Sequence, residues 1–293
     1  MSNVEGWKIG LIGLGHMGKP MARNLHQAGA EVTVSSRSPD PVNELAGEGL
    51  ARASTPGDVA AAADIVIIMV TDTAGVDQVL HGPDGVIAGL TPGKTVIDMG
   101  TTKVRETREW AKEVVAAGCA YVDAPVSGGQ VGAEQGSLSI MVGCTVDALE
   151  RVRPVFEVLG GNITHIGDIG AGQVAKTANQ AIVAVTLAAV AEGLTLAQRA
   201  GVDPGKVREA LQGGFAESRV LDLHGGRMVE RKFEPGGPAR VQLKDVDQAL
   251  ELAAQVALET PTLTNTQKLW QKMIDHGWGE LDQAGIIRVI EEL

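Results

Sequence analysis

Between Lys8 and Ile166, short β-branched runs alternate with stretches that repeat apolar residues at helical spacing. The runs are almost continuously apolar, which is typical of parallel strands covered by helices on both faces. Gly29 and Gly118 follow two of the helical stretches, where a residue that tolerates positive φ favours a helix end. The pattern predicts an α/β domain with a doubly wound parallel sheet. The predicted strands are Lys8–Ile12, Glu31–Val34, Ile65–Val70, Thr95–Asp98, Ala120–Asp123, Leu138–Val142 and Ile163–Ile166. The clearest helices between them are Met21–Ala28, Val104–Ala117 and Val146–Leu159.

The strand pattern ends after Gly170–Gly172, and the remaining chain repeats apolar residues only at helical spacing. The first helix, Val174–Ala200, would be about 40 Å long at ~1.5 Å per residue and would form the spine of a second domain. Because Thr186 and Glu192 interrupt its apolar stretch, we expect a buried helix rather than a membrane span. The change predicts an α/β domain over residues 1–167 and a smaller all-helical domain over residues 168–293. The other predicted helices are Pro204–Leu211, Arg219–Val229, Val241–Ala257, Thr262–Asp275 and Gln283–Glu291.

Composition and charge exclude several functions. The chain has 36 acidic and 25 basic residues, and its net charge of −11 disfavours nucleic acid or an anionic membrane as a partner. The two cysteines, Cys119 and Cys144, form no C-x-x-C pair, which fits a reducing cytoplasm. The N-terminal segment lacks the basic start and apolar core of a signal peptide, so we expect a cytoplasmic protein. No histidine has the spacing of a metal ligand set, and we predict that the protein needs no metal ion.

A glycine-rich turn follows the first predicted strand directly. Its spacing, G-x-G-x-x-G, stands between a strand and a helix, which is the context in which it binds a dinucleotide pyrophosphate. Gly13 permits the tight turn, Gly15 lets the backbone approach the phosphates, and Gly18 lets helix and strand pack closely. We therefore predict a Rossmann-type NAD(P)-binding domain. The residues of the turn are Gly13, Leu14, Gly15, His16, Met17 and Gly18.

The end of the second predicted strand indicates which nicotinamide cofactor binds. An acidic residue there binds the ribose 2′-hydroxyl of NAD, whereas a basic one accepts the 2′-phosphate of NADP. This chain has Ser36 and Arg37, and the planar guanidinium suits a phosphate. We predict NADP as the preferred cofactor, with NAD as the alternative. Asp40, the competing acid, lies between two prolines, and we interpret it as a helix cap.

Two later segments offer polar groups to a substrate. Ser127 is followed by Gly128 and Gly129 after a predicted strand, and a turn of this kind presents N–H groups and a hydroxyl that suit a carboxylate. Lys176, with amides three and four residues later at Asn179 and Gln180, shares one helix face with them. Spacing alone leaves two interpretations of Lys176 open: a proton-transferring lysine and a lysine whose charged end reaches solvent.

These segments together resemble the β-hydroxyacid dehydrogenase family, which includes 3-hydroxyisobutyrate dehydrogenase, tartronate semialdehyde reductase and, more distantly, 6-phosphogluconate dehydrogenase. The resemblance spans nearly the whole chain in the expected order, and several short segments carry it. They are Gly13–Gly18, Asp123–Gly143, Gly170–Gln180 and Lys244–Asp245, with shorter matches at Met69–Thr71 and Gly100–Thr102.

The resemblance implies an oxidoreductase that transfers a hydride between a nicotinamide cofactor and a small β-hydroxy acid or its aldehyde. It places Lys176 at the position of the general acid/base. The implied substrate contacts are Thr101, Ser127, Gly128, Gly129, Asn179, Gln180 and Lys244. The implied cofactor contacts are the six residues of the glycine-rich turn with Ser36, Arg37, Val70, Thr71, Thr101 and Lys244.

The chain departs from its relatives at two positions that concern the substrate. Many relatives have Asn four residues after the lysine, where this chain has Gln180, so either Asn179 or Gln180 is the implied contact. Several have an aromatic residue eight positions before Asp245, where this chain has Gly237. The loop Val70–Thr73 and the run Ser139–Val142 are slightly closer to the tartronate semialdehyde branch.

The fold leaves two other functions to consider. Imine reductases share the architecture but usually lack a lysine at the position of Lys176, which this chain retains. A non-catalytic dinucleotide-binding sensor is disfavoured because Lys176, Ser127 and the glycines are all present. As partners we expect a small anionic substrate and, from the long apolar helix, other copies of the chain in a homodimer or homotetramer.

Overall fold

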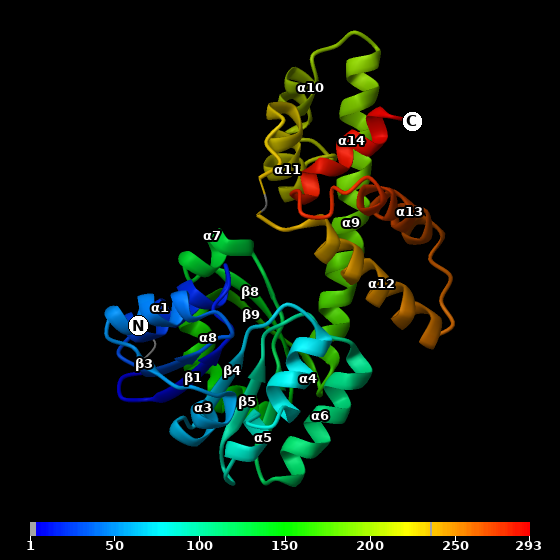
Figure 1. Ribbon diagram of the computed structural model, residues 1–293. Helices are drawn as coiled ribbons and strands as arrows, with labels where there is room; N and C mark the ends of the chain where they lie inside the picture. Colours follow the sequence, from blue (N-terminus) through cyan, green and yellow to red (C-terminus); the bar gives the residue numbers. More distant parts are fainter. Residues whose placement is uncertain (1–3, 235) are drawn as a thin grey trace. The chain divides into compact units, whose positions relative to one another are not determined.

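The computed structural model describes residues 4–234 and 236–293. Residues 1–3 and Pro235 lie outside the described residues. The first three belong to the N-terminal segment of the predicted α/β domain. The chain divides into two compact units, Met1–Lys176 and Thr177–Leu293, here called the α/β unit and the helical unit. The ribbon in Figure 1 shows both units and labels most of their helices and strands.

The α/β unit is built on one sheet that has nine strands in the described residues. The strands β3, β2, β1, β4, β5 and β6 lie side by side in this order, and all are parallel. The sheet continues with β8, which is antiparallel to β6 and β7 and parallel to β9. The bounds are β1 (Lys8–Ile12), β2 (Glu31–Ser35), β3 (Ala51–Arg52), β4 (Ile65–Ile68), β5 (Thr95–Asp98), β6 (Ala120–Asp123), β7 (Val126–Ser127), β8 (Leu138–Gly143) and β9 (Gly160–Gly167).

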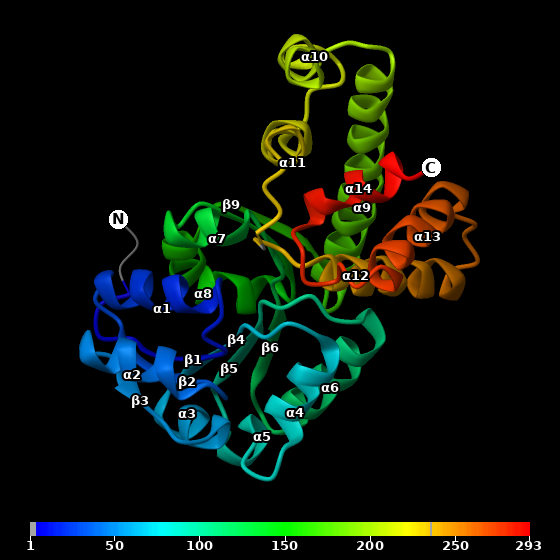
Figure 2. The ribbon, with the colours of Figure 1, turned by 45° about the horizontal axis from the view of Figure 1, so that its top comes forward.

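Helices cover both faces of this sheet, as the doubly wound prediction requires. One face carries α1 (Gly18–Gln27), α2 (Pro39–Gly47) and α8 (Val146–Leu159). The other carries α3 (Pro56–Ala62), α4 (Thr73–His81), α5 (Val86–Gly89) and α6 (Val104–Ala116), which lie together in Figure 2. The short α7 (Gly129–Glu134) follows β7.

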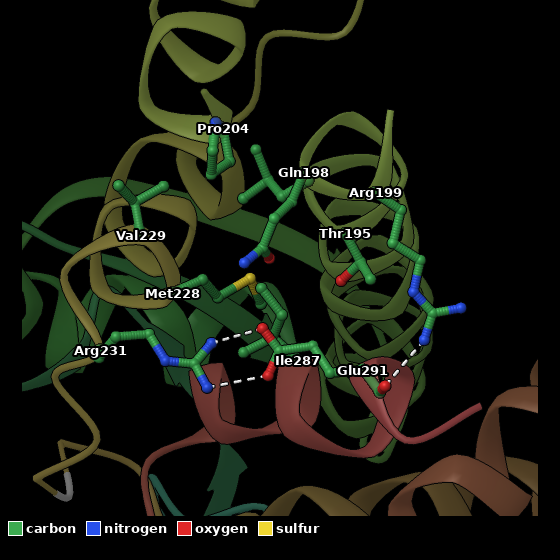
Figure 3. A pocket seen from close by; sticks show the side chains of 10 residues that line it. Thr195, Gln198, Arg199, Pro204, Met228, Val229, Arg231, Ile287 and Glu291 are labelled. Carbon is green, nitrogen blue, oxygen red and sulfur yellow. Dashed lines mark hydrogen bonds and ion pairs between the residues drawn. The ribbon is translucent and has the colours of Figure 1, made fainter. Parts of the chain in front are cut away.

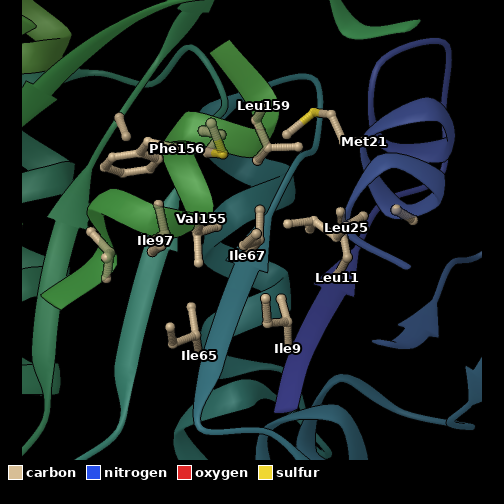
Figure 4. Packing of buried hydrophobic residues seen from close by; sticks show 14 of the residues in the cluster. Ile9, Leu11, Met21, Leu25, Ile65, Ile67, Ile97, Val155, Phe156 and Leu159 are labelled. Carbon is tan, nitrogen blue, oxygen red and sulfur yellow. The ribbon is translucent and has the colours of Figure 1, made fainter. Parts of the chain in front are cut away.

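Alternate strand residues fill two separate hydrophobic cores. Ile9 and Ile67 belong, with Phe156 of α8, to the hydrophobic cluster on one face, part of which Figure 4 shows. Val66 and Ile68, which flank Ile67 in the chain, belong to the cluster on the other face. Because successive side chains of a strand point to opposite faces, a strand covered on both sides is apolar throughout. This explains the continuous apolar runs from which the strands were predicted.

The structure corrects the prediction in several details. The sheet is parallel only as far as β6. The segment before β8 forms β7 and the short α7 instead of a helix that crosses the sheet, and a parallel connection needs such a crossover. Helix α1 begins at Gly18 rather than Met21, and β4 ends at Ile68 rather than Val70. Asp40 is not the cap of α2, because it lies inside the first turn.

The helical unit contains the helices predicted for the second half of the chain. Trp270, which is fully buried, lies in its core together with Leu187 and Ala191 of α9. The predicted helix at the C-terminus divides into a 3₁₀ turn and α14. The bounds are α9 (Ala171–Arg199), α10 (Pro204–Leu211), α11 (Arg219–Glu230), α12 (Ala239–Gln255), α13 (Pro261–Asp275), η1 (Gln283–Gly285) and α14 (Ile286–Glu291). The predicted boundary after residue 167 precedes α9 and stays a prediction.

Helix α9 is the longest element and is buried on one face only. By length and composition, α9 is apolar enough to cross a membrane. In its most apolar stretch, 33% of the residues are buried inside the chain. Ala184, Leu187 and Ala191 lie in the core of the helical unit, whereas Ile182 and Leu196 are 67% and 71% exposed. The expectation of a buried helix therefore holds for one face of α9. The other face is apolar and not covered by the described residues.

Candidate functional site

The glycine-rich turn between β1 and α1 combines two kinds of glycine. A Cβ at Gly13 would lie 2.3 Å from the carbonyl oxygen of Met69, and one at Gly18 would lie 1.8 Å from that of Gly13. Both are therefore required by packing, and Gly13 also has a φ of 99°. A Cβ at Gly15 would meet nothing within 4 Å. The turn thus leaves open space beside Gly15 and the N-terminus of α1, where a pyrophosphate fits.

The other predicted cofactor residues follow the ends of neighbouring parallel strands. Ser36 and Arg37 come directly after β2, and Arg37 is exposed with no ion pair to the described residues. Val70 and Thr71 follow β4, and Thr101 follows β5. Because β2, β1, β4 and β5 are adjacent and parallel, these residues and the glycine-rich turn share one edge of the sheet. This is the edge at which doubly wound sheets bind their ligands.

The Ser127 turn has a backbone that only glycine adopts easily. Ser127 ends β7, where it pairs with Ser139 of β8. Gly128 and Gly129 follow with φ values of 138° and 63°, and both are exposed. These conformations are strained for any residue with a side chain. The turn therefore presents a hydroxyl and exposed backbone at the start of α7, as a carboxylate site requires.

Lys176 is buried in the first turns of α9, with 7% of its surface exposed. Lysine is rarely buried to this extent in proteins. The preceding turn of α9 is held by Asp123, which accepts hydrogen bonds from the N–H groups of Gly170 and Gln173 at 2.6 and 2.9 Å. The side chain of Gln173 in turn holds the loop that contains Thr101. The burial of Lys176 favours the proton-transferring interpretation over a lysine at the surface, and its role stays a prediction.

Sequence reasoning assigned no role to Asp123 or Gln173. Burial raises the pKa of Asp123 to about 6, although the N–H groups of Gly170 and Gln173 act to lower it. The one signal in the sequence was an acidic residue at the end of an apolar strand, where its carboxylate had to be buried or to face a ligand. Its actual partners lie 47 and 50 residues further along the chain, so no local pattern revealed them.

Asn179 and Gln180 belong to a polar cluster within the helical unit. Asn179 Nδ2 donates to Gln180 Oε1 at 2.8 Å, and Gln180 Nε2 donates to Asp245 Oδ2. The Lys244 ammonium lies 2.8 Å from the other oxygen of Asp245, which is almost fully buried. The structure thus brings Asn179, Gln180 and Lys244 together around the carboxylate of Asp245. In the sequence, Asp245 stood out only as part of the Lys244–Asp245 motif.

Gly237 stands where several relatives have an aromatic residue. The space beside it is occupied by other residues of the helical unit. A Cβ at Gly237 would lie 3.0 Å from the side-chain nitrogen of Gln283. The buried Asp282 accepts the N–H groups of Gly236 and Gly237 at 3.0 and 3.3 Å. Burial alone would raise the pKa of Asp282, but His224 and the main-chain donors bring it below its ordinary value. The loop that has Gly237 in place of an aromatic residue is therefore held by hydrogen bonds to the Asp282 carboxylate.

A cavity of about 530 Å³ lies elsewhere in the helical unit, between α9, α11 and α14. Figure 3 shows Arg231 at its edge, donating two hydrogen bonds to Glu291. None of the predicted site residues lines it. Within the described residues, no group of three His, Cys, Asp or Glu side chains is arranged to hold a metal ion. That the protein needs no metal stays a prediction.

Comparison with known proteins covers almost the entire chain. Residues 8–167 match the family described as the NAD binding domain of 6-phosphogluconate dehydrogenase. Residues 170–290 match the family described as NAD-binding of NADP-dependent 3-hydroxyisobutyrate dehydrogenase. The 2-hydroxy-3-oxopropionate reductase of Escherichia coli (strain K12) is 44% identical over 284 residues, which cover 97% of each chain.

Solved structures share the complete fold. A 3-hydroxyisobutyrate dehydrogenase from Salmonella typhimurium has a TM-score of 0.90 at 28% identity, over 97% of this chain and 99% of that one. A protein described as Psf3 in complex with NADP+ and 2-OPP has a TM-score of 0.88 at 25% identity, over 96% and 99%. These matches confirm the predicted Rossmann-type domain followed by a helical domain.

Proposed function

Because the chain belongs to the β-hydroxyacid dehydrogenase family and is a nicotinamide-dependent oxidoreductase, we propose that Lys176 is its proton-transferring residue. When bound, the nicotinamide cofactor would supply or accept the hydride at the carbon that bears the oxygen. Lys176 as an ammonium donates a proton to the carbonyl oxygen in reduction, and as a neutral amine accepts it from the hydroxyl in oxidation. The burial of Lys176 at a fixed turn of α9 is the observation that supports this role most directly.

The substrate that we propose is a small β-hydroxy acid or the corresponding aldehyde, with 2-hydroxy-3-oxopropionate (tartronate semialdehyde) first and 3-hydroxyisobutyrate second. Ser127 and the N–H groups of Gly128 and Gly129 bind its carboxylate. The positive φ of both glycines supports this, since such turns concentrate N–H groups. The relative named 2-hydroxy-3-oxopropionate reductase supports the first substrate.

Nicotinamide absorbance tests the substrate class. Purified protein is given NADPH or NADH with a panel of semialdehydes, or the oxidised cofactor with the corresponding hydroxy acids. We expect the highest kcat/KM for a three- or four-carbon acid that bears its oxygen β to the carboxylate. Equal activity on an aldehyde that lacks the carboxylate would contradict the role of the Ser127 turn.

Asn179, rather than Gln180, is the amide that we propose to orient the substrate oxygen. The Gln180 amide already bonds to Asp245 and to Asn179, whereas the side-chain oxygen of Asn179 accepts no hydrogen bond from the described residues. The Asn179→Ala substitution should therefore raise KM for the substrate more than Gln180→Asn does, which restores the residue common among relatives. A larger effect of Gln180→Asn would reverse the assignment.

The preferred cofactor that we propose is NADP. Arg37 is exposed beyond the end of β2 without an ionic partner among the described residues, and Ser36 beside it adds a hydroxyl. Both suit the 2′-phosphate. Removing the guanidinium in Arg37→Ala should raise the KM for NADPH at least about tenfold and leave that for NADH nearly unchanged, since a charge-assisted phosphate contact is worth about 1.5–3 kcal/mol. An unchanged ratio of the two KM values would eliminate this contact.

A further inference from the structure

The end of β6 carries a buried acidic side chain that caps a distant helix. Asp123 is 0% exposed, and its Oδ1 accepts the N–H of Gly170 at 2.6 Å. Its Oδ2 accepts the N–H of Gln173 at 2.9 Å. These two residues flank the start of α9 at Ala171. Free N–H groups and the positive end of the helix dipole both favour a carboxylate at this place.

Glycines enclose the carboxylate on two sides. A Cβ at Gly143 would lie 2.5 and 2.7 Å from its two oxygens, and one at Gly172 would lie 2.8 Å from Oδ2. Neither position leaves room for a larger residue while Asp123 stays in place. At Gly172 the carbonyl oxygen of Met141 would lie 2.3 Å from such a Cβ, so this glycine is required by the backbone of β8 as well as by the carboxylate.

The same turn of α9 has a second anchor in the side chain of Gln173. Its Oε1 accepts the N–H of Thr102 at 3.1 Å, and its Nε2 donates to the carbonyl oxygen of Gly100 at 2.9 Å. Asp98 holds this loop from β5, because its Oδ1 accepts the N–H of Gly100 at 2.9 Å. The first turn of α9 is therefore fixed to the end of β6 through Asp123 and to the loop after β5 through Gln173.

A carboxylate suits this arrangement better than a neutral cap. Asp123 uses both oxygens as acceptors, one for each N–H group, whereas a serine or an asparagine offers only one. Although burial raises its pKa to about 6, the group is ionised at the slightly alkaline pH where an assay is convenient. Burying this charge costs free energy, which the N–H groups of Gly170 and Gln173 offset in part.

We propose that Asp123 is a positioning residue for proton transfer, which fixes the first turn of α9 and thereby the direction from which Lys176 reaches the substrate. Lys176 follows Gln173 by three residues, so the next turn of the helix starts from the turn that Asp123 holds. A small rotation of this turn would displace the ammonium, and displacements of about 1 Å are known to cost about 10²-fold in rate. The proposal rests on the proposed role of Lys176.

The test is the substitution Asp123→Asn, studied at pH 8. The amide keeps the size of the side chain but turns an NH₂ group toward one of the two N–H donors. We expect kcat to fall at least about tenfold while the KM for the cofactor stays within about twofold. We also expect faster hydrogen–deuterium exchange in the peptide 168–176. Thr55→Ala is the matched control, because it removes the cap of α3 in the same unit, away from the candidate site.

Two results would overturn the proposal. One is a folded Asp123→Asn protein with wild-type kcat and wild-type exchange in this peptide. The other is an equal loss of kcat and cofactor affinity, which would indicate a general loosening of the α/β unit. If Asp123→Asn does not fold, Gln173→Met decides by the same criteria, since it removes the second anchor only. A wild-type protein without turnover would instead refute the proposed function, and the exchange measurement would still report on the cap.

Discussion

At the scale of single residues, the glycines of the first turn separate packing from ligand binding. Gly18 has no room for a Cβ, which would lie 1.8 Å from a backbone oxygen, whereas a Cβ at Gly15 would meet open space. We predict that Gly15→Ala keeps the wild-type melting temperature but weakens NADPH binding at least about tenfold, because the backbone can no longer approach the phosphates. Gly18→Ala should weaken NADPH binding and, unlike Gly15→Ala, should also lower the melting temperature. Melting curves and fluorescence titration measure both, and unchanged NADPH affinity in Gly15→Ala would contradict the predicted cofactor position.

Asp123 gives a pH dependence of stability with a definite sign. Its pKa is about 6 in the folded protein against an ordinary value of 3.8, which applies to the unfolded chain, and burial is the chief cause of the difference. The folded state therefore binds this proton more tightly, so the contribution is fully present below pH ~4 and is lost as the pH rises through about 6. The loss amounts to about 3 kcal/mol. Urea unfolding should show the free energy of wild type minus that of Asp123→Asn falling across this window and level above it. A difference that rises with pH would contradict the burial of this carboxylate.

Residues with a role that depends on neighbours in sequence were predictable, and those that depend on distant contacts were not. The glycines of the first turn and of the Ser127 turn were found because a turn is a local structure. Asp123 and Asp245 were quoted within motifs without a role, since their partners come from α9. The burial of Lys176 likewise could not be derived from its spacing to Asn179 and Gln180.

At the scale of elements, continuous apolar runs predicted the central strands well because strands such as β4 and β5 are buried along their whole length. β3 and β7 were missed, since two residues carry no periodicity. The reversal at β8 was missed because direction depends on the connection and not on the strand itself. Helix ends at Gly29 and Gly118 were predicted correctly, with φ values of 93° and 77°.

Helix α3 provides a test of how its C-terminal end is satisfied. The Lys94 ammonium is buried and donates to the carbonyl oxygens of Ala60 and Ala61, near the end of this helix. The substitution Lys94→Met keeps the apolar stem and leaves these oxygens without their donor. We predict a loss of about 1–3 kcal/mol in the free energy of unfolding, with kcat unchanged. Lys112→Met, at an exposed lysine of α6, is the matched control in urea titrations. Equal stability of the two variants would show that the buried ammonium contributes nothing.

At the scale of the whole molecule, the uncovered face of α9 predicts self-association. Ile182 and Leu196 are each about two-thirds exposed on a helix whose opposite face is packed. They lie seven residues on either side of Ala189, so two antiparallel copies of α9 would pair each Ile182 with a Leu196. We predict a homodimer or homotetramer by light scattering, and smaller species for Ile182→Glu and Leu196→Glu. Val115→Glu, at an exposed site of α6, is the control. A monomeric wild-type protein would refute this prediction.

The overall organisation followed from a change of pattern along the chain, from strands and helices to helices alone. What pattern does not supply at this scale is which apolar faces a single copy leaves open. The apolar stretch of α9 predicted both a buried helix and contact with other copies, but hydropathy does not show which face packs within the chain and which is left for another copy. Residence in the cytoplasm and the number of copies therefore stay predictions.

The central claim is that Lys176 transfers the proton, and the most direct measurement is the pair of kcat and cofactor dissociation constant for Lys176→Ala. With the best substrate of the panel, we predict that kcat falls by about 10²–10⁴-fold, the range typical of losing a general acid/base. The dissociation constant of NADPH, followed by its fluorescence, should stay within about threefold, because the glycine-rich turn is untouched. Retention of more than about a tenth of the wild-type kcat, with NADPH bound normally, would contradict the account.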